Sequence, residues 1–152
     1  MSVERAGPTE LEALRRLIDQ WAEAELAANP LLIAVDRDPP GRWYLRMRGE
    51  EKAFVTIWLT LRERTLAFET YFMPAPEEQV GACYEYLLRV NPRLFLWRFA
   101  IGLEDAVYLV GQLPVSAVDT DELDRIMGSG YAYSEEYFRS AMRIGYASRF
   151  PG

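Results

Sequence analysis

Residues 42–73 read RWYLRMRGEEKAFVTIWLTLRERTLAFETYFM, and this stretch decides the fold. In its three runs apolar side chains alternate with polar ones, which is typical of strands with one buried and one solvated face. The connectors between the runs are only a few residues long, whereas parallel strands need crossovers of a dozen residues or more. The sequence therefore predicts an antiparallel meander, preceded by a further short strand over residues 31–35.

The chain before the meander is predicted to form a tail and one helix. We expect residues 1–8 to be a flexible N-terminal tail and residues 9–152 to form a single domain, because one core is typical of about 100–200 residues. Thr9 and Glu12 fit a capping box, and apolar residues then recur at helical spacing. Asn29-Pro30 ends this helix, because proline disfavours helical backbone in the residue before it.

A second helix and a hairpin are predicted after the meander. Pro74-Ala-Pro76 ends the sheet and begins the helix, and the two glutamates at 77–78 complement the positive end of its dipole. Asn91-Pro92 ends it. Alternating residues over 95–101 and an apolar run over 107–113 then predict two more strands.

A third helix is predicted at the C-terminal end. Asp119 and Glu122 fit a second capping box, and apolar residues follow at helical spacing. Gly128 and Gly130 weaken a helix, so we expect a kink or break near Ser129. The predicted order is α-β-β-β-β-α-β-β-α, an α+β fold with an antiparallel sheet flanked by helices.

Composition restricts the class of protein. The net charge is −6, which argues against general nucleic-acid binding, since that needs a basic face. No apolar run is long enough for a membrane helix, no signal peptide is visible, and a single cysteine permits no internal disulfide. We therefore expect a cytoplasmic protein that binds neither membranes nor nucleic acid.

The sequence offers little for catalysis or metal binding. It contains no histidine, which removes the commonest general base and metal ligand. Cys83 falls on or beside the apolar stripe of the second helix and is interpreted as a buried structural thiol. The segment that contains Asp119, Asp121 and Asp124 lacks the glycine and the glutamate that a calcium loop requires. Helix capping is therefore the better interpretation of these aspartates. We expect no catalytic residues, no metal, no cofactor and no enzymatic activity.

Aromatic residues are unusually frequent, with 4 tryptophans, 9 tyrosines and 7 phenylalanines. Trp58 and Tyr71 fall on the opposite strand face from their apolar neighbours, so a second apolar surface needs covering. Either helices cover both faces of the sheet, or one face binds another chain, of which a homodimer is the commonest form. The candidate contact residues are Trp43, Trp58 and Tyr71, with Arg46 and Arg48 as anchors for acidic groups.

Several segments resemble the YbjN-domain family, described as bacterial sensory transduction regulators. The resemblance covers roughly residues 31–150 and is most specific through Met73-Pro-Ala-Pro-Glu-Glu78. One departure is Gln79-Val80, where the family pattern has a histidine after the paired glutamates; this loss further disfavours catalysis by the segment. The matching segments are Arg64–Glu78, Tyr84–Arg89 with Asn91, Phe99–Ile101, Ala106–Gly111, Leu123–Arg125 and Ile144–Ser148.

This resemblance implies a fold like that of the type III secretion chaperones, which are homodimers that bind extended segments of client proteins. It supplies no catalytic residues. The leading hypothesis is a non-enzymatic module that binds a protein or peptide in a regulatory or chaperone-like role. The alternative is a small-ligand sensor that holds its effector between the sheet and the C-terminal helices, and a third hypothesis is an enzyme that uses buried carboxylates.

Overall fold

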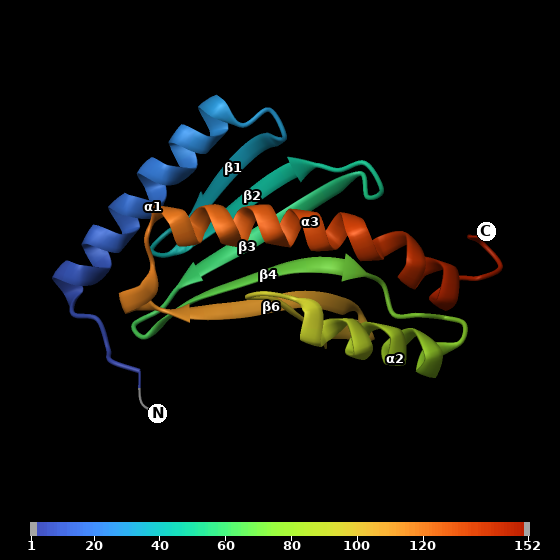
Figure 1. Cartoon of the computed structure of the whole chain (residues 1–152). Coiled ribbons are helices and arrows are strands. Elements are labelled where there is room, and N and C mark those ends of the chain that lie inside the picture. Colours follow the sequence, from blue (N-terminus) through green and yellow to red (C-terminus); the bar gives the residue numbers. More distant parts are fainter. Residues whose placement is uncertain (1–2, 151–152) are drawn as a thin grey trace.

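The computed structural model describes residues 3–150 and contains an antiparallel sheet of six strands (Figure 1). The spatial order is β1-β2-β3-β4-β6-β5, so the predicted meander is followed by a hairpin whose second strand joins β4. The strands are β1 (Leu32–Asp38), β2 (Arg42–Arg48), β3 (Phe54–Leu61), β4 (Thr65–Met73), β5 (Arg98–Ile101) and β6 (Val107–Pro114).

The three α-helices pack on one face of this sheet (Figure 1). They are α1 (Pro8–Ala28), α2 (Val80–Val90) and α3 (Thr120–Gly145), with short 3₁₀ helices η1 (Asn91–Arg93), η2 (Leu103–Asp105) and η3 (Val115–Ala117). The core lies between the helices and the inward side chains of the strands. Its largest fully buried side chains include Ile18, Leu45, Ile57, Leu59, Phe68, Phe72, Leu109, Leu123 and Ile126. The predicted α+β class and element order are confirmed.

The start of α1 differs from the prediction. Gly7 is the N-cap residue of the helix and has no side chain that could accept a hydrogen bond. The capping box predicted at Thr9 therefore does not form. The described part of the expected tail lies against the β3–β4 turn instead of away from the domain. Ala6 is buried, and its N–H donates to the Glu63 carbonyl at 2.7 Å. Residues 1–2 lie outside the described part of the chain.

The start of α2 was predicted four residues too early. The helix begins at Val80, and the two preceding glutamates contact the end of α3 instead of capping α2. The N–H groups of Glu77 and Glu78 both donate to the Gly145 carbonyl, at 3.0 and 2.9 Å. The Glu78 carboxylate also accepts hydrogen bonds from Ser148, and these lower the pKa of the Glu78 carboxyl.

The third helix is continuous from Thr120 to Gly145, so the predicted break near Ser129 is wrong. Its predicted cap is confirmed, because the Asp119 carboxylate accepts a hydrogen bond from the Glu122 N–H at 2.8 Å. Gly130 lies where the helix meets the Trp97 ring, and a Cβ atom there would come within 2.5 Å of that ring. The glycine therefore permits close packing on the sheet without interrupting the helix.

Strand β5 is shorter than the predicted run of residues 95–101. The chain turns at Leu96, whose φ is 72°, and this conformation breaks the alternation. Trp97 is buried and donates from Nε1 to the Ser129 hydroxyl at 3.1 Å, whereas Phe95 is 66% exposed. Only Arg98–Ile101 pairs with β6.

Among residues 3–150, no helix combines the length and the apolar character needed to span a bilayer.

Candidate binding surface

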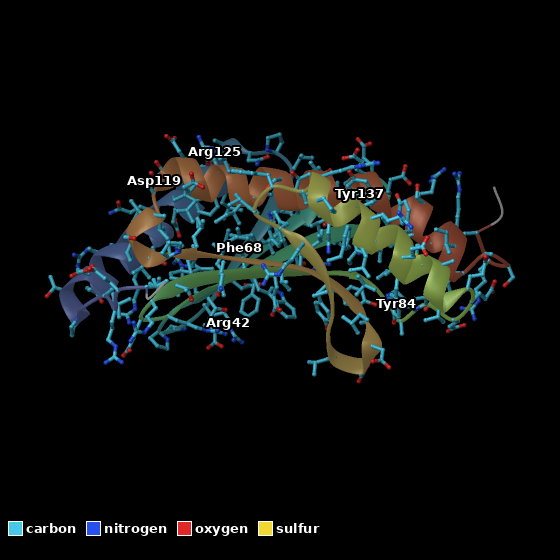
Figure 2. All side chains as sticks on the ribbon, turned by 60° about the horizontal axis from the view of Figure 1, so that its bottom comes forward. Arg42, Phe68, Tyr84, Asp119, Arg125 and Tyr137 are labelled. Atoms are coloured by element: carbon cyan, nitrogen blue, oxygen red, sulfur yellow. The ribbon has the colours of Figure 1, made fainter. Side chains whose placement is uncertain are left out.

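The face of the sheet opposite the helices is left uncovered within the described chain, and we call it the open face. Figure 2 shows Arg42 on this side of the sheet, whereas Asp119 and Arg125 of α3 lie on the other side. Along β2 and β3, each buried side chain alternates with one that is only partly buried or exposed. Strand register assigns to the open face Asp36, Asp38, Arg42, Tyr44, Arg46, Arg48, Phe54, Thr56, Trp58, Thr60, Ala67, Glu69, Tyr71, Arg98, Ala100, Tyr108, Val110 and Gln112.

Four of the five candidate contact residues lie on the open face: Arg46, Arg48, Trp58 and Tyr71. Trp43 does not, so the prediction that it contacts a partner is wrong. Its side chain is 3% exposed on the helix side, and Nε1 donates to the Asp19 carboxylate at 2.8 Å. The indole is therefore part of the contact between α1 and β2.

Aromatic side chains on the open face meet in edge-to-face pairs. The Tyr44 and Trp58 rings have centroids 6.1 Å apart, and those of Tyr71 and Tyr108 are 5.7 Å apart. Such pairs add stability beyond the area that they bury. Apolar ring surface on this face remains accessible, since Tyr71 is 41% exposed and Phe54 is 43% exposed.

Arginines also lie on the open face, and within the described residues they form no ion pairs with carboxylates. Within residues 3–150, the ion pairs closer than 4.0 Å include none formed by Arg42, Arg46 or Arg48. The same holds for Arg62, which follows β3, and for Arg98 on β5. The arginines of the helices, in contrast, mostly pair with carboxylates. The open face therefore presents cationic groups that remain available to a partner.

One arginine is held in place by a ring. The guanidinium carbon of Arg46 lies 3.9 Å from the centroid of the Phe54 ring, a cation–π contact between adjacent strands. Nearby, a hollow of about 130 Å³ opens on the same face. Its rim includes Arg42, Trp58 and Arg62, and Glu69 also lines it. The hollow is small and accessible to solvent, and it suits a side chain better than a whole metabolite.

Sequence reasoning missed several residues of this surface, notably Tyr44, Phe54 and Tyr108. The signal that could have found Tyr44 was available, because it is in phase with Arg46 along β2. Tyr108 could not be placed opposite Tyr71 without knowing that β6 pairs with β4.

A second apolar surface lies between α2 and β5, and we call it the α2–β5 groove. It has a volume of about 210 Å³ and is lined by Tyr84, Leu87, Leu88, Phe99, Ala100, Ile101 and Val107. Leu88 is 65% exposed and Ile101 is 56% exposed. Beside it, β5 forms an edge of the sheet. The Asn91 side chain bonds both the N–H and the carbonyl of Phe99 at this edge.

Among residues 3–150, Lys52, between β2 and β3, is the one ionisable group with a large pKa shift. Its amine donates to the Phe72 carbonyl and lies 4.7 Å from the centroid of the Phe138 ring. Burial lowers the pKa of this amine to about 8, and the nearby Glu135 carboxylate opposes the shift. The amine lies between the Phe138 ring of α3 and the Tyr71 ring, whose centroid is 5.4 Å away, so Lys52 borders the open face.

Within residues 3–150, neither surface includes the cysteine or a metal-binding cluster. Cys83 is fully buried, as predicted, and burial raises the pKa of its thiol, which disfavours the reactive thiolate. Among the described residues, no group of three or more cysteine, aspartate and glutamate side chains is arranged to hold a metal ion.

The architecture matches several solved structures, among them a type III secretion chaperone. One is the ExsC–ExsE complex, with a TM-score of 0.60 and 18% identity over 85% of this chain and 93% of that one. Another is the Yersinia pestis type III secretion chaperone SycH in complex with a stable fragment of YscM2, with a TM-score of 0.53 and 18% identity over 79% of this chain and 95% of that one. The class of fold is therefore that of the type III secretion chaperones.

Within this fold class, the chain belongs to the YbjN family, described as "Putative bacterial sensory transduction regulator", whose profile matches residues 15–141. Uncharacterized proteins of Mycobacterium bovis and Mycobacterium leprae are 30% and 29% identical to it. These matches cover 72% and 70% of this chain. The chain spans only about 60% of the length of these relatives.

Proposed function

We propose that this chain is a non-enzymatic, cytoplasmic module that recognises another protein through the open face, in a regulatory or chaperone-like role. The observation that carries the proposal is the combination of exposed rings and unpaired arginines on a sheet face that no described helix covers. Aromatic residues and arginine are the residue types most enriched where proteins bind each other.

Two further points favour a protein partner. The solved structures with this fold include a type III secretion chaperone in complex with a protein fragment. The alternative function, a small-ligand sensor, needs space for its effector between the sheet and the C-terminal helix. This region is closely packed where Gly130 meets Trp97, since even a Cβ atom would come within 2.5 Å of the ring. Binding on the open face needs no such space.

We also propose that the protein is a homodimer formed through the α2–β5 groove. Support comes from Leu88, Ile101 and Leu103, which are 65%, 56% and 81% exposed on neighbouring elements. Apolar side chains exposed together in this way are typical of interfaces. At the β5 edge itself the Asn91 side chain already bonds the backbone of Phe99, so the proposed contact rests on these apolar side chains and not on strand pairing.

Light scattering tests the dimer. We expect the wild-type chain to have twice the monomer mass and the Ile101→Asp variant to have the monomer mass, because a charge in an apolar interface is costly to bury. Leu26→Ser, which changes a leucine that is 41% exposed on α1, is the matched control and should remain dimeric. A monomeric wild-type chain, or a dimeric Ile101→Asp variant, contradicts this interface.

Site-specific cross-linking in the cells of origin tests the function. A photoreactive residue replaces Thr56, on the open face, or Gln20, which is exposed on α1. We expect a discrete cross-linked protein from position 56 only, and a lower yield when Trp58→Ala is combined with it. Equal cross-linking from both positions, or none from position 56, contradicts the proposal.

A further inference from the structure

The outward residues of β2 and β3 form a stripe of positive charge on the open face. We call Arg42, Tyr44, Arg46, Arg48, Phe54, Trp58 and Arg62 the arginine–aromatic stripe. Neither strand contains an aspartate or a glutamate, although the chain as a whole has a net charge of −6. The stripe is therefore a local reversal of the protein's overall charge.

We propose that the arginine–aromatic stripe binds an extended acidic segment of the partner protein, a proposal that rests on the open face being the recognition surface. Complementary charge across an interface selects partners and accelerates association. Arginine suits this role because its planar guanidinium binds carboxylates in a bidentate geometry.

The spacing of the arginines matches an extended chain. Arg42, Arg46 and Arg48 lie on one face of β2, so their spacing along the strand is four residues and then two. At about 3.3 Å per residue the three positions span about 20 Å. An extended partner with carboxylates at alternate positions presents them on one side with the same repeat, and roughly seven residues cover the stripe.

Rings fix the charges and supply apolar contact. The Phe54 ring lies under the Arg46 guanidinium, so that this group loses less freedom on binding. The Tyr44–Trp58 pair lies between Arg42, at the start of β2, and the two arginines nearer its end. Residues of the partner between its carboxylates are expected to pack on these rings.

The surroundings of the stripe favour a peptide over single-stranded nucleic acid, which also binds arginines and aromatic rings. Asp36 and Asp38 of β1 border the stripe on one side, and Glu69 of β4 borders it on the other. With strands about 4.8 Å apart, these borders are about 14 Å from each other, enough for one extended peptide. A nucleic acid carries a phosphate at every nucleotide and would meet these carboxylates repeatedly.

Fluorescence anisotropy with short labelled probes tests the proposal. The probe is an eight-residue peptide that alternates glutamate with threonine or valine, and its control has glutamine in place of each glutamate. We expect the glutamate peptide to bind the full-length protein at least about tenfold more tightly, since several exposed ion pairs of ordinary strength together give a difference of this size. Raising the salt from 50 to 300 mM should remove most of this difference, a dependence expected of exposed charges.

Variants then locate the site. Arg42→Gln, Arg46→Gln and Arg48→Gln together should abolish the preference for glutamate. The matched control, Arg16→Gln, Arg89→Gln and Arg143→Gln, removes the same charge from the helical side and should keep the preference. A control that loses the preference equally shows only a general charge effect and overturns the proposal. The comparison of the two peptides on the wild-type chain needs no variant and stands even if one fails to fold.

Three other outcomes overturn the acidic partner: equal binding of both peptides, binding of neither, or tighter binding of an eight-nucleotide oligothymidine. None of these outcomes affects the cross-linking result at position 56. Failure of the acidic partner and failure of the open face as a protein-binding surface are therefore distinguishable.

Discussion

Lys52 makes the stability of the fold depend on pH in a way that one substitution removes. Its amine has a pKa of about 8 in the folded chain, whereas an unperturbed lysine has a pKa of 10.5. Below pH 8 the amine is protonated in both states, so the folded state carries the full cost of the buried charge. Between pH 8 and 10.5 only the unfolded chain keeps the proton, and stability therefore rises with pH in this window.

The size of the effect follows from the two pKa values. At about 1.4 kcal/mol for each pH unit between them, the buried charge costs about 3 kcal/mol in total. Raising the pH from 7 to 9.5 should remove about 2 kcal/mol of this cost. Burial raises the pKa of tyrosines such as Tyr71. As the pH rises above 10 these tyrosines ionise more readily in the unfolded chain, so the folded state loses stability. They are present in wild type and variant alike, so their effect cancels in the comparison.

Denaturant unfolding of the wild type and of Lys52→Met, at pH 7 and at pH 9.5, measures the difference. We expect the wild type to gain about 2 kcal/mol relative to the variant over this range. Because Lys52 is the only lysine in the sequence, NMR of its labelled side chain reports the pKa without assignment. Parallel stability curves, or a pKa near 10.5, would refute the reasoning.

Two further predictions concern α3. Gly130→Ala should destabilise the fold by about 1–3 kcal/mol through overpacking, because the new Cβ would come within 2.5 Å of Trp97. Gly128→Ala places its Cβ in open space and should stabilise the fold by up to about 1 kcal/mol. Both values come from denaturant unfolding, and equal effects at the two positions contradict this packing. Asp119→Ala should cost about 1 kcal/mol by thermal unfolding, since it removes the cap, and Thr9→Ala should leave stability within about 0.5 kcal/mol. A larger loss from Thr9→Ala than from Asp119→Ala would contradict the observed caps.

Local patterns in the sequence predicted the elements well where local forces decide them. Alternation placed the strands of the meander, and Asn29-Pro30 ended α1 where predicted. The cap at Asp119 was also correct, because it involves only residues three positions apart. The fold class followed from the short connectors, which exclude parallel pairing.

The errors arose where contacts between distant residues override local preference. The start of α2 is delayed because Glu77 and Glu78 bond to Gly145, far along the chain. Helix α3 continues through Gly130, where it packs closely against the Trp97 ring, a contact that no local pattern reveals.

The candidate site was predicted in part. Trp58 and Tyr71 were placed on the correct side because they are out of phase with their apolar neighbours. Trp43 was chosen for its residue type, although it is in phase with Leu45 and therefore on the buried side. The indole N–H of Trp43 donates to Asp19 of α1, and only the packing of that helix on the sheet reveals this partner.

NMR of the four tryptophan indoles tests most directly whether an acidic segment binds on the open face. The Nε1–H groups of Trp21, Trp43 and Trp97 donate to side chains of α1 and α3, whereas Trp58 lies on the open face. When the glutamate peptide is titrated into the protein, we expect the Trp58 indole signal to shift and the other three to stay in place. Saturable binding that moves the Trp21 or Trp97 signal and leaves that of Trp58 unchanged would contradict the account.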